Sequence, residues 1–105
     1  MTDQQAAKRY AQAVFQIATA TPGASLDQWR ADLRDVAEVL TDSAAAGILA
    51  NAKVLLPARY AMLERMLDVS PQALNLAKLL VAKGRSPEAR AVAEAFDRLA
   101  DEHEG

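Results

Sequence analysis

Apolar residues recur at spacings of three and four along almost the whole chain, which is the period of an amphipathic α-helix. No segment shows the period-two alternation and β-branched enrichment that are typical of strands. The pattern therefore predicts an all-α fold. Six helices joined by short loops would form an antiparallel bundle over residues 1–105, which is the size of one domain.

The beginning of the chain carries clear signals for a helix end and a helix start. The first predicted helix runs from about Asp3 to Thr19 and ends before the helix-breaking residues Pro22 and Gly23. Ser25 then opens the second helix as its N-cap. Because Gln28 follows three residues later, we expect a capping box in which each side chain binds the free backbone N–H of the other residue.

The second predicted helix has the most regular apolar face in the chain. That face consists of Leu26, Trp29, Leu33, Val36, Ala37 and Leu40. The charged residues of the same helix are expected to lie largely outside the face and to form ion pairs along the surface. They are Arg30, Asp32, Arg34 and Asp35.

The middle of the chain predicts two further helices. A short helix over residues 43–51 is weakened by Gly47, which costs about 1 kcal/mol relative to alanine inside a helix. Pro57 fits the first position of the fourth helix, where its missing N–H would have no partner anyway. The inner face of this helix is expected to comprise Tyr60, Leu63, Met66 and Leu67.

Two Ser-Pro pairs, Ser70-Pro71 and Ser86-Pro87, predict the starts of the fifth and sixth helices, each as an N-cap followed by a first-turn proline. Gly84 is expected to close the fifth helix in the left-handed conformation. The sixth helix should lose its order in the polar tail from Asp101 onward. Its predicted inner residues are Val92, Ala93, Phe96, Leu99 and Ala100.

The first helix carries more apolar surface than one core contact needs. Its apolar residues span roughly 200° of the helix, whereas a surface helix needs little more than about 100°. One stripe consists of Ala7, Ala11, Phe15 and Ala18, and a second consists of Ala6, Tyr10, Ala13, Val14 and Ile17. Two interpretations remain open: the helix is buried on two sides, or the second stripe binds a partner.

The fifth helix adds one apolar residue that its core face does not explain. Leu79 projects away from that face among Asn75, Lys78, Ala82 and Lys83. A single exposed leucine commonly has no function. If Leu79 lies beside the second stripe of the first helix, however, the two helices would frame an apolar groove with a polar rim, which suits one amphipathic helix of a partner.

Composition argues against several classes of protein. There are 12 basic and 14 acidic residues, for a net charge of −2, and the basic residues form no patch that would indicate nucleic-acid binding. The chain has no cysteine, so disulfides and thiolate zinc sites are excluded. We also expect no membrane insertion, because no apolar run approaches the length of a membrane span.

No catalytic constellation is recognisable. His103 is the only histidine and lies in the polar tail, where a solvated side chain is the expected state. No spacing typical of a phosphate-binding loop or of a nucleophile with its base is present. We therefore expect no enzyme activity, no metal and no cofactor.

Three segments in this order resemble one family: AKRYAQAVFQIA near the N-terminus, LDQWRADLRDVAEVL after it, and NLAKLLVAKGR before the sixth helix. Together they are similar to the N-terminal domain of the delta subunit of rotary ATP synthases, called the oligomycin-sensitivity-conferring protein in mitochondria. The resemblance implies a six-helix bundle that caps the catalytic hexamer as part of the peripheral stalk, so that the hexamer resists rotor torque.

The resemblance also implies a partner and a site. In that family a groove between the first and fifth helices receives the amphipathic N-terminal helix of an alpha subunit. Carried over to this chain, the partner-binding residues would be Tyr10, Ala13, Ile17, Asn75, Lys78, Leu79 and Ala82.

Family members continue beyond the matching region into a C-terminal part that joins the b subunits of the stalk. The sequence given ends at Gly105, so we expect an isolated N-terminal domain, with a natural short form as the alternative. The absence of an evident transit peptide favours a bacterial protein that is peripheral to the cytoplasmic face of the plasma membrane, within the ATP synthase.

Other functions remain as alternatives. The chain could be a generic helical protein-interaction domain, or a helix-turn-helix nucleic-acid binder, although the fifth and sixth helices offer few of the basic and amide residues that a recognition helix needs. A small enzyme lacks a constellation. Binding to a membrane surface through Lys8 and Arg9 would rest on only two basic residues.

Overall fold

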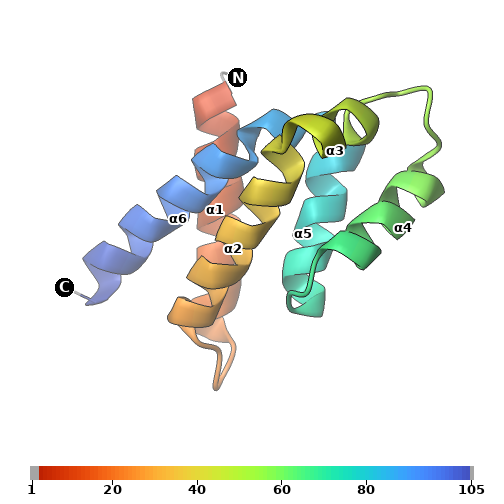
Figure 1. The fold of residues 1–105 in the computed structure, drawn as a ribbon. Helices are drawn as coiled ribbons and strands as arrows, with labels where there is room; N and C mark the ends of the chain where they lie inside the picture. Colours follow the sequence, from red (N-terminus) through yellow and green to blue (C-terminus); the bar gives the residue numbers. More distant parts are fainter. Residues whose placement is uncertain (1–2, 105) are drawn as a thin grey trace.

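The computed structural model describes residues 3–104, and within this range the chain is helical with no strand (Figure 1). The six-helix all-α prediction is confirmed. The elements are α1 (Asp3–Ala20), α2 (Leu26–Thr41), α3 (Ser43–Leu49), α4 (Leu56–Met66), α5 (Pro71–Ala82), the short 3-10 helix η1 (Ser86–Glu88) and α6 (Ala89–Glu104).

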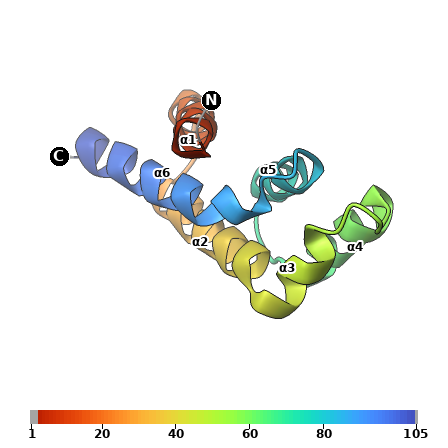
Figure 2. The same ribbon diagram turned by 90° about the horizontal axis from the view of Figure 1, so that it is seen from above.

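The helices pack in two connected groups. The helix α6 packs along both α1 and α2, whereas α5 packs against α2 and α4, and η1 joins the two groups. Seen from above, α1 and α5 lie on the same side of α2, and α5 lies between α1 and α4 (Figure 2). This arrangement leaves the outer sides of α1 and α5 uncovered by other helices.

The core is centred on Phe96 of α6, which is fully buried. Its ring meets that of Phe15 of α1 edge to face at 5.9 Å between centroids, and that of Trp29 of α2 at 6.4 Å. Three helices thus meet at one side chain. His103 is exposed as expected, but its ring also lies 5.5 Å from that of Phe15, at a steep angle.

The predicted helix start at Ser25 is half confirmed. The Ser25 hydroxyl accepts the backbone N–H of Gln28 at 3.1 Å, as an N-cap should. The reciprocal half of the capping box is wrong, because the Gln28 side chain donates instead to a carboxylate oxygen of Asp32 at 2.8 Å. A charged acceptor on the next turn competes with the backbone for the amide.

Asp32 was expected outside the apolar face of the second helix, and this expectation is wrong: the residue is 2% exposed. Its second carboxylate oxygen accepts the backbone N–H of Ser70 at 3.1 Å. Ser70 is the N-cap of α5, as predicted, and its hydroxyl accepts the N–H of Ala73. Asp32 therefore connects α2 to the start of α5, which explains its burial.

Replacing Asp32 with alanine is expected to lower the free energy of unfolding by about 1–3 kcal/mol, because the half-buried Ser70 N–H loses its charged acceptor. Urea denaturation followed by far-UV circular dichroism measures the change. Asp35→Ala is the matched control, since Asp35 is exposed on the same helix. Equal stability of the two variants would contradict the connecting role of Asp32.

The end of α5 confirms the predicted glycine cap. Gly84 has φ +68°, and its N–H donates to the carbonyl of Val81 at 3.1 Å. The next residue, Arg85, donates its N–H to the carbonyl of Leu80 at 2.8 Å. These two hydrogen bonds form a Schellman motif, in which a left-handed residue reverses the chain at the end of a helix.

The sixth helix starts differently from the prediction. Ser86 does not cap it: the residue is buried in η1, its hydroxyl makes no hydrogen bond to the described residues, and α6 begins only at Ala89. The helix η1 packs against α1, α2, α5 and α6, so Ser86 is enclosed where an N-cap would be exposed. Pro87 still occupies a first-turn position, but in the 3-10 helix.

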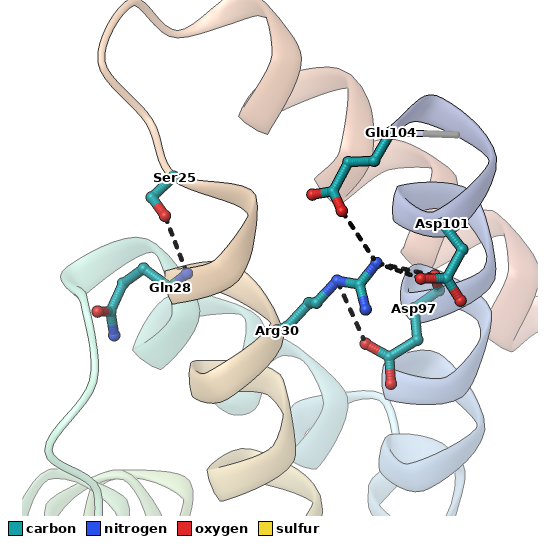
Figure 3. A network of polar contacts seen from close by, with 6 residues as sticks. All are labelled: Ser25, Gln28, Arg30, Asp97, Asp101 and Glu104. Atoms are coloured by element: carbon teal, nitrogen blue, oxygen red, sulfur yellow. Dashed lines mark hydrogen bonds and ion pairs between the residues drawn. The ribbon is translucent and has the colours of Figure 1, made fainter.

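The expected loss of order from Asp101 onward is also wrong, because α6 continues to Glu104. The cause is Arg30 of α2, which was expected outside the core face and is in fact half-buried. Its guanidinium lies 2.6 Å from Asp101, 3.9 Å from Glu104 and 4.0 Å from Asp97, all on α6 (Figure 3). The hydrogen bond that Arg30 donates to the Asp101 carboxylate raises the pKa of Arg30, and the cluster connects the last turns of α6 to α2.

Two details of α4 differ from the prediction. The helix begins at Leu56, so Pro57 is its second residue, and Met66 is 43% exposed instead of facing the core. Leu63 is buried as expected, and Leu67 is buried just beyond the helix as its C-cap.

The connection between α3 and α4 is held by a buried side chain that the sequence pattern did not indicate. Arg59 donates to the backbone carbonyls of Val54 at 2.9 Å and Leu49 at 3.3 Å. With the backbone fixed in this way, Leu55 points outward and is 76% exposed. Leu55 therefore offers a control position for substitutions on the surface.

Candidate functional site

The second apolar stripe of α1 is partly buried and partly exposed. Ala6 and Val14 are buried, Tyr10 is half-buried, Ala13 is exposed and Ile17 is 47% exposed. The first stripe faces the core, with Ala7, Ala11 and Ala18 buried and Phe15 half-buried. The core therefore uses only part of the apolar surface of α1. The remaining apolar edge is formed by Tyr10, Ala13 and Ile17 and is called the α1 edge.

A surface depression of about 380 Å³ lies at the N-terminal half of this edge. It is lined by Ala6, Arg9, Tyr10, Ala13 and Arg85. The last of these residues comes from the segment between α5 and η1, and η1 packs against α1, so the depression is bounded by two elements that are far apart in the sequence. Its lining combines apolar side chains with two cationic ones.

The predicted residues of α5 do not line this depression. Leu79 is 41% exposed, and Asn75 and Ala82 are exposed as well. Lys78 is engaged with α4 instead: its ammonium lies 3.0 Å from the carboxylate of Glu64 and 5.7 Å from the centre of the Tyr60 ring. The Lys78 side chain is thus directed toward α4.

The position of Lys78 also shows which way Leu79 faces. Successive residues of a helix are about 100° apart, so Leu79 lies beyond the outward-facing Asn75 and Ala82, on the side of α5 away from α4. In Figure 2 that side is the one that α1 flanks. Leu79 and the α1 edge therefore belong to one face of the molecule, although α1 and α5 do not pack closely against each other.

The two helices run antiparallel on this face (Figure 1). The N-terminal half of α1 lies beside the C-terminal end of α5, which is why Arg85 meets Tyr10 and Ala13 at the depression. Ile17 follows Ala13 by one turn, about 6 Å along the axis, toward the beginning of α5. The apolar face thus extends from the depression along α1, with Leu79 on the opposite helix.

Sequence reasoning missed Arg9 and Arg85 as residues of the site. Arg9 falls in the polar sector of α1, and Arg85 resembled an ordinary cation at a helix end. The only available signal was Gly84, because a left-handed glycine at a helix end predicts a sharp change of direction in the following chain. Where that change leads Arg85 could not be derived from the local pattern.

Glu88 lies beside this site, with its carboxylate 3.6 Å from Arg85 and its side chain only 11% exposed. Burial raises its pKa above the ordinary value, and the neighbouring Asp3 raises it further, against a lowering by its own backbone hydrogen bond and by Arg85. The folded chain therefore favours the protonated form of Glu88 more than the unfolded chain does.

Glu88→Gln is expected to remove a pH-dependent loss of stability. A raised folded-state pKa means that the contribution of Glu88 is fully present below its unfolded pKa and is lost as the pH rises through the folded value. Between about pH 4 and pH 7 the wild type should therefore lose stability relative to Glu88→Gln, as measured by thermal unfolding at both pH values. A constant difference across this range would refute the raised pKa.

No group of three or more histidine, cysteine, aspartate or glutamate residues within residues 3–104 is arranged to hold a metal ion. In the same range, no helix combines the length and the apolar character needed to cross a membrane.

Comparison with known proteins gives consistent results over nearly the whole chain. The family model described as ATP synthase delta (OSCP) subunit matches residues 6–105. A protein named ATP synthase subunit delta from Dehalococcoides mccartyi is 35% identical over 99 residues, which cover 94% of this chain and 54% of the relative. A protein of the same name from Citrifermentans bemidjiense is 30% identical over 103 residues, with 94% and 56% covered.

The chain spans about half the length of these curated relatives. No solved structure matches it.

Proposed function

Because the chain belongs to the ATP synthase delta (OSCP) subunit family, we propose that it is a non-catalytic module of the peripheral stalk, with the face between the α1 edge and Leu79 binding an amphipathic N-terminal helix of an alpha subunit. In this role the domain holds the catalytic hexamer against rotor torque. The b subunits of the stalk would be partners of the full-length protein. The location would be the cytoplasmic face of a bacterial plasma membrane, without insertion into it.

The observation that carries this proposal is the apolar surface of α1 and α5 that the core leaves unused. Tyr10 and Ala13 line a depression, and Ile17 and Leu79 are each more than 40% exposed on the same face. A partner helix laid along α1 would cover these side chains together with apolar residues of its own. That is the helix-in-groove mode of recognition, in which anchors at helical spacing enter a hydrophobic surface.

The energetics of such binding depend on a few anchors. Burial of apolar surface contributes about 25 cal/mol per Å², but the loss of translational and conformational freedom offsets much of it. The loss of conformational freedom is smaller on this side of the molecule, because α1 is fixed by its packing against α6, and α5 by its packing against α2 and α4. The ordering cost then falls mainly on the partner peptide.

The testing experiment is a titration of the chain with a synthetic peptide of about 20 residues, long enough for five helical turns. The peptide carries the alpha-subunit N-terminal sequence of the organism that supplies the chain. Calorimetry gives the stoichiometry and affinity, and the fluorescence of Trp29 reports changes in the domain on binding. A scrambled peptide of equal composition is the control. Saturable one-to-one binding of the native sequence alone supports the proposal, and equal or absent binding of both peptides refutes it.

A further inference from the structure

Two arginines from different elements line the depression on the α1 edge. Arg9 comes from α1 and Arg85 from the segment between α5 and η1. The other lining residues are Ala6, Tyr10 and Ala13, so no carboxylate lines the depression. A surface that is acidic overall, with a net charge of −2, thus presents two cations at one apolar spot.

Both the backbone and the side chain of Arg85 are held in place. Its N–H closes the Schellman motif of α5, and its guanidinium lies 3.6 Å from the carboxylate of Glu88. A guanidinium has five N–H donors, so one ion pair leaves donors for a further acceptor. The side chain is 31% exposed, which keeps it accessible at the border of the depression.

Arg9 is exposed and makes no ion pair with another residue in the described part of the chain. Near the site, the carboxylate of Glu88 faces Arg85, and Asp3 acts on Glu88. One pre-ordered and one unpaired cation therefore share the lining of the depression with the apolar side chains.

From this geometry we propose that Arg9 and Arg85 select the occupant by charge, so that the bound helix carries aspartate or glutamate three or four residues from its apolar anchor. The inference rests on the proposed function, since it takes the occupant to be an amphipathic helix. Charges at the border of an interface chiefly set specificity and association rate. Because they remain near solvent, their effect is screened by salt.

Two designed helical peptides test the charge selection. They share one apolar face and differ only in the flanking positions, which hold glutamate in one peptide and lysine in the other. At about 50 mM salt the chain should bind the glutamate peptide at least about tenfold more tightly, and at about 500 mM salt the difference should fall to about twofold or less. Calorimetry and stopped-flow fluorescence measure the affinity and the association rate.

Charge-reversed variants identify the residues responsible. The double variant Arg9→Glu with Arg85→Glu should prefer the lysine peptide. Arg9→Glu alone should reduce the preference, and it leaves the turn at Arg85 intact because Arg9 is exposed on α1. Arg34→Glu is the matched control, since Arg34 is exposed on α2 and makes no ion pair within the described residues, and it should keep the wild-type preference.

The charge selection would be overturned if the two designed peptides bound equally or if neither bound. It would also be overturned if Arg34→Glu reduced the preference as much as Arg9→Glu does. Its failure is distinguishable from failure of the proposed function. If the alpha-subunit peptide binds while the designed pair shows no preference, only the charge selection is wrong. If the alpha-subunit peptide fails to bind, the proposed function is wrong, whatever the designed pair does.

Discussion

Phe96→Ala is expected to lower the free energy of unfolding by about 3–5 kcal/mol, which is the range for truncating a buried aromatic side chain. Phe96 is fully buried where α1, α2 and α6 meet, and its ring contacts those of Phe15 and Trp29. The cavity left by the ring would lie between α1, α2 and α6. A domain of this size has only about 5–15 kcal/mol of stability in total.

Urea denaturation followed by far-UV circular dichroism gives the change, since this signal does not depend on the altered surroundings of Trp29. Leu55→Ala is the control: Leu55 is 76% exposed, and its truncation should change the stability by less than about 0.5 kcal/mol. A loss below about 1 kcal/mol for Phe96→Ala would show that the centre of the core lies elsewhere.

The second large effect is expected at Leu79. On the proposed function, Leu79→Asp should weaken binding of the alpha-subunit peptide at least about 30-fold, because a carboxylate replaces the proposed apolar anchor and must be desolvated against the partner helix. The fold should survive, since Leu79 is 41% exposed and lies outside the buried face of α5. Calorimetric titration measures the affinity, and thermal unfolding checks the fold.

Leu55→Asp is the matched control, because it makes the same chemical change at an exposed leucine in the α3–α4 connection. It should bind the peptide as the wild type does. If both variants bind normally, Leu79 is not an anchor, and the partner surface is confined to α1. If both variants lose binding, the effect comes from added negative charge and not from a lost contact.

Local signals in the sequence predicted the helices well. The Ser25 hydroxyl, the Ser70 hydroxyl and the left-handed Gly84 each act on backbone groups within a few residues, so neighbouring sequence suffices to predict them. The spacing of apolar residues likewise predicted six helices and the all-α class. It also identified Leu79 as an apolar residue outside the core face of its helix.

The errors at Asp32 and Arg30 have a different cause, namely partners that are distant in the sequence. Asp32 is buried because it accepts an N–H from Ser70, 38 residues away, and Arg30 reaches Asp101, 71 residues away. The helical period places Arg30 and Asp32 at the two borders of the apolar face of α2, and Arg34 and Asp35 farther from it. Which partners the two border residues meet is decided only by the packing of α2 against α5 and α6.

The candidate site likewise combines features that follow from local sequence with features that depend on distant partners. The sequence by itself determined that α1 has more apolar surface than one core contact needs, because helical period assigns each residue to a direction. The tertiary structure decided that Lys78 turns to Glu64 on α4, and that Arg85 joins Arg9 at the depression. Directions around one helix follow from local backbone geometry, whereas the neighbours in those directions depend on how all the helices pack together.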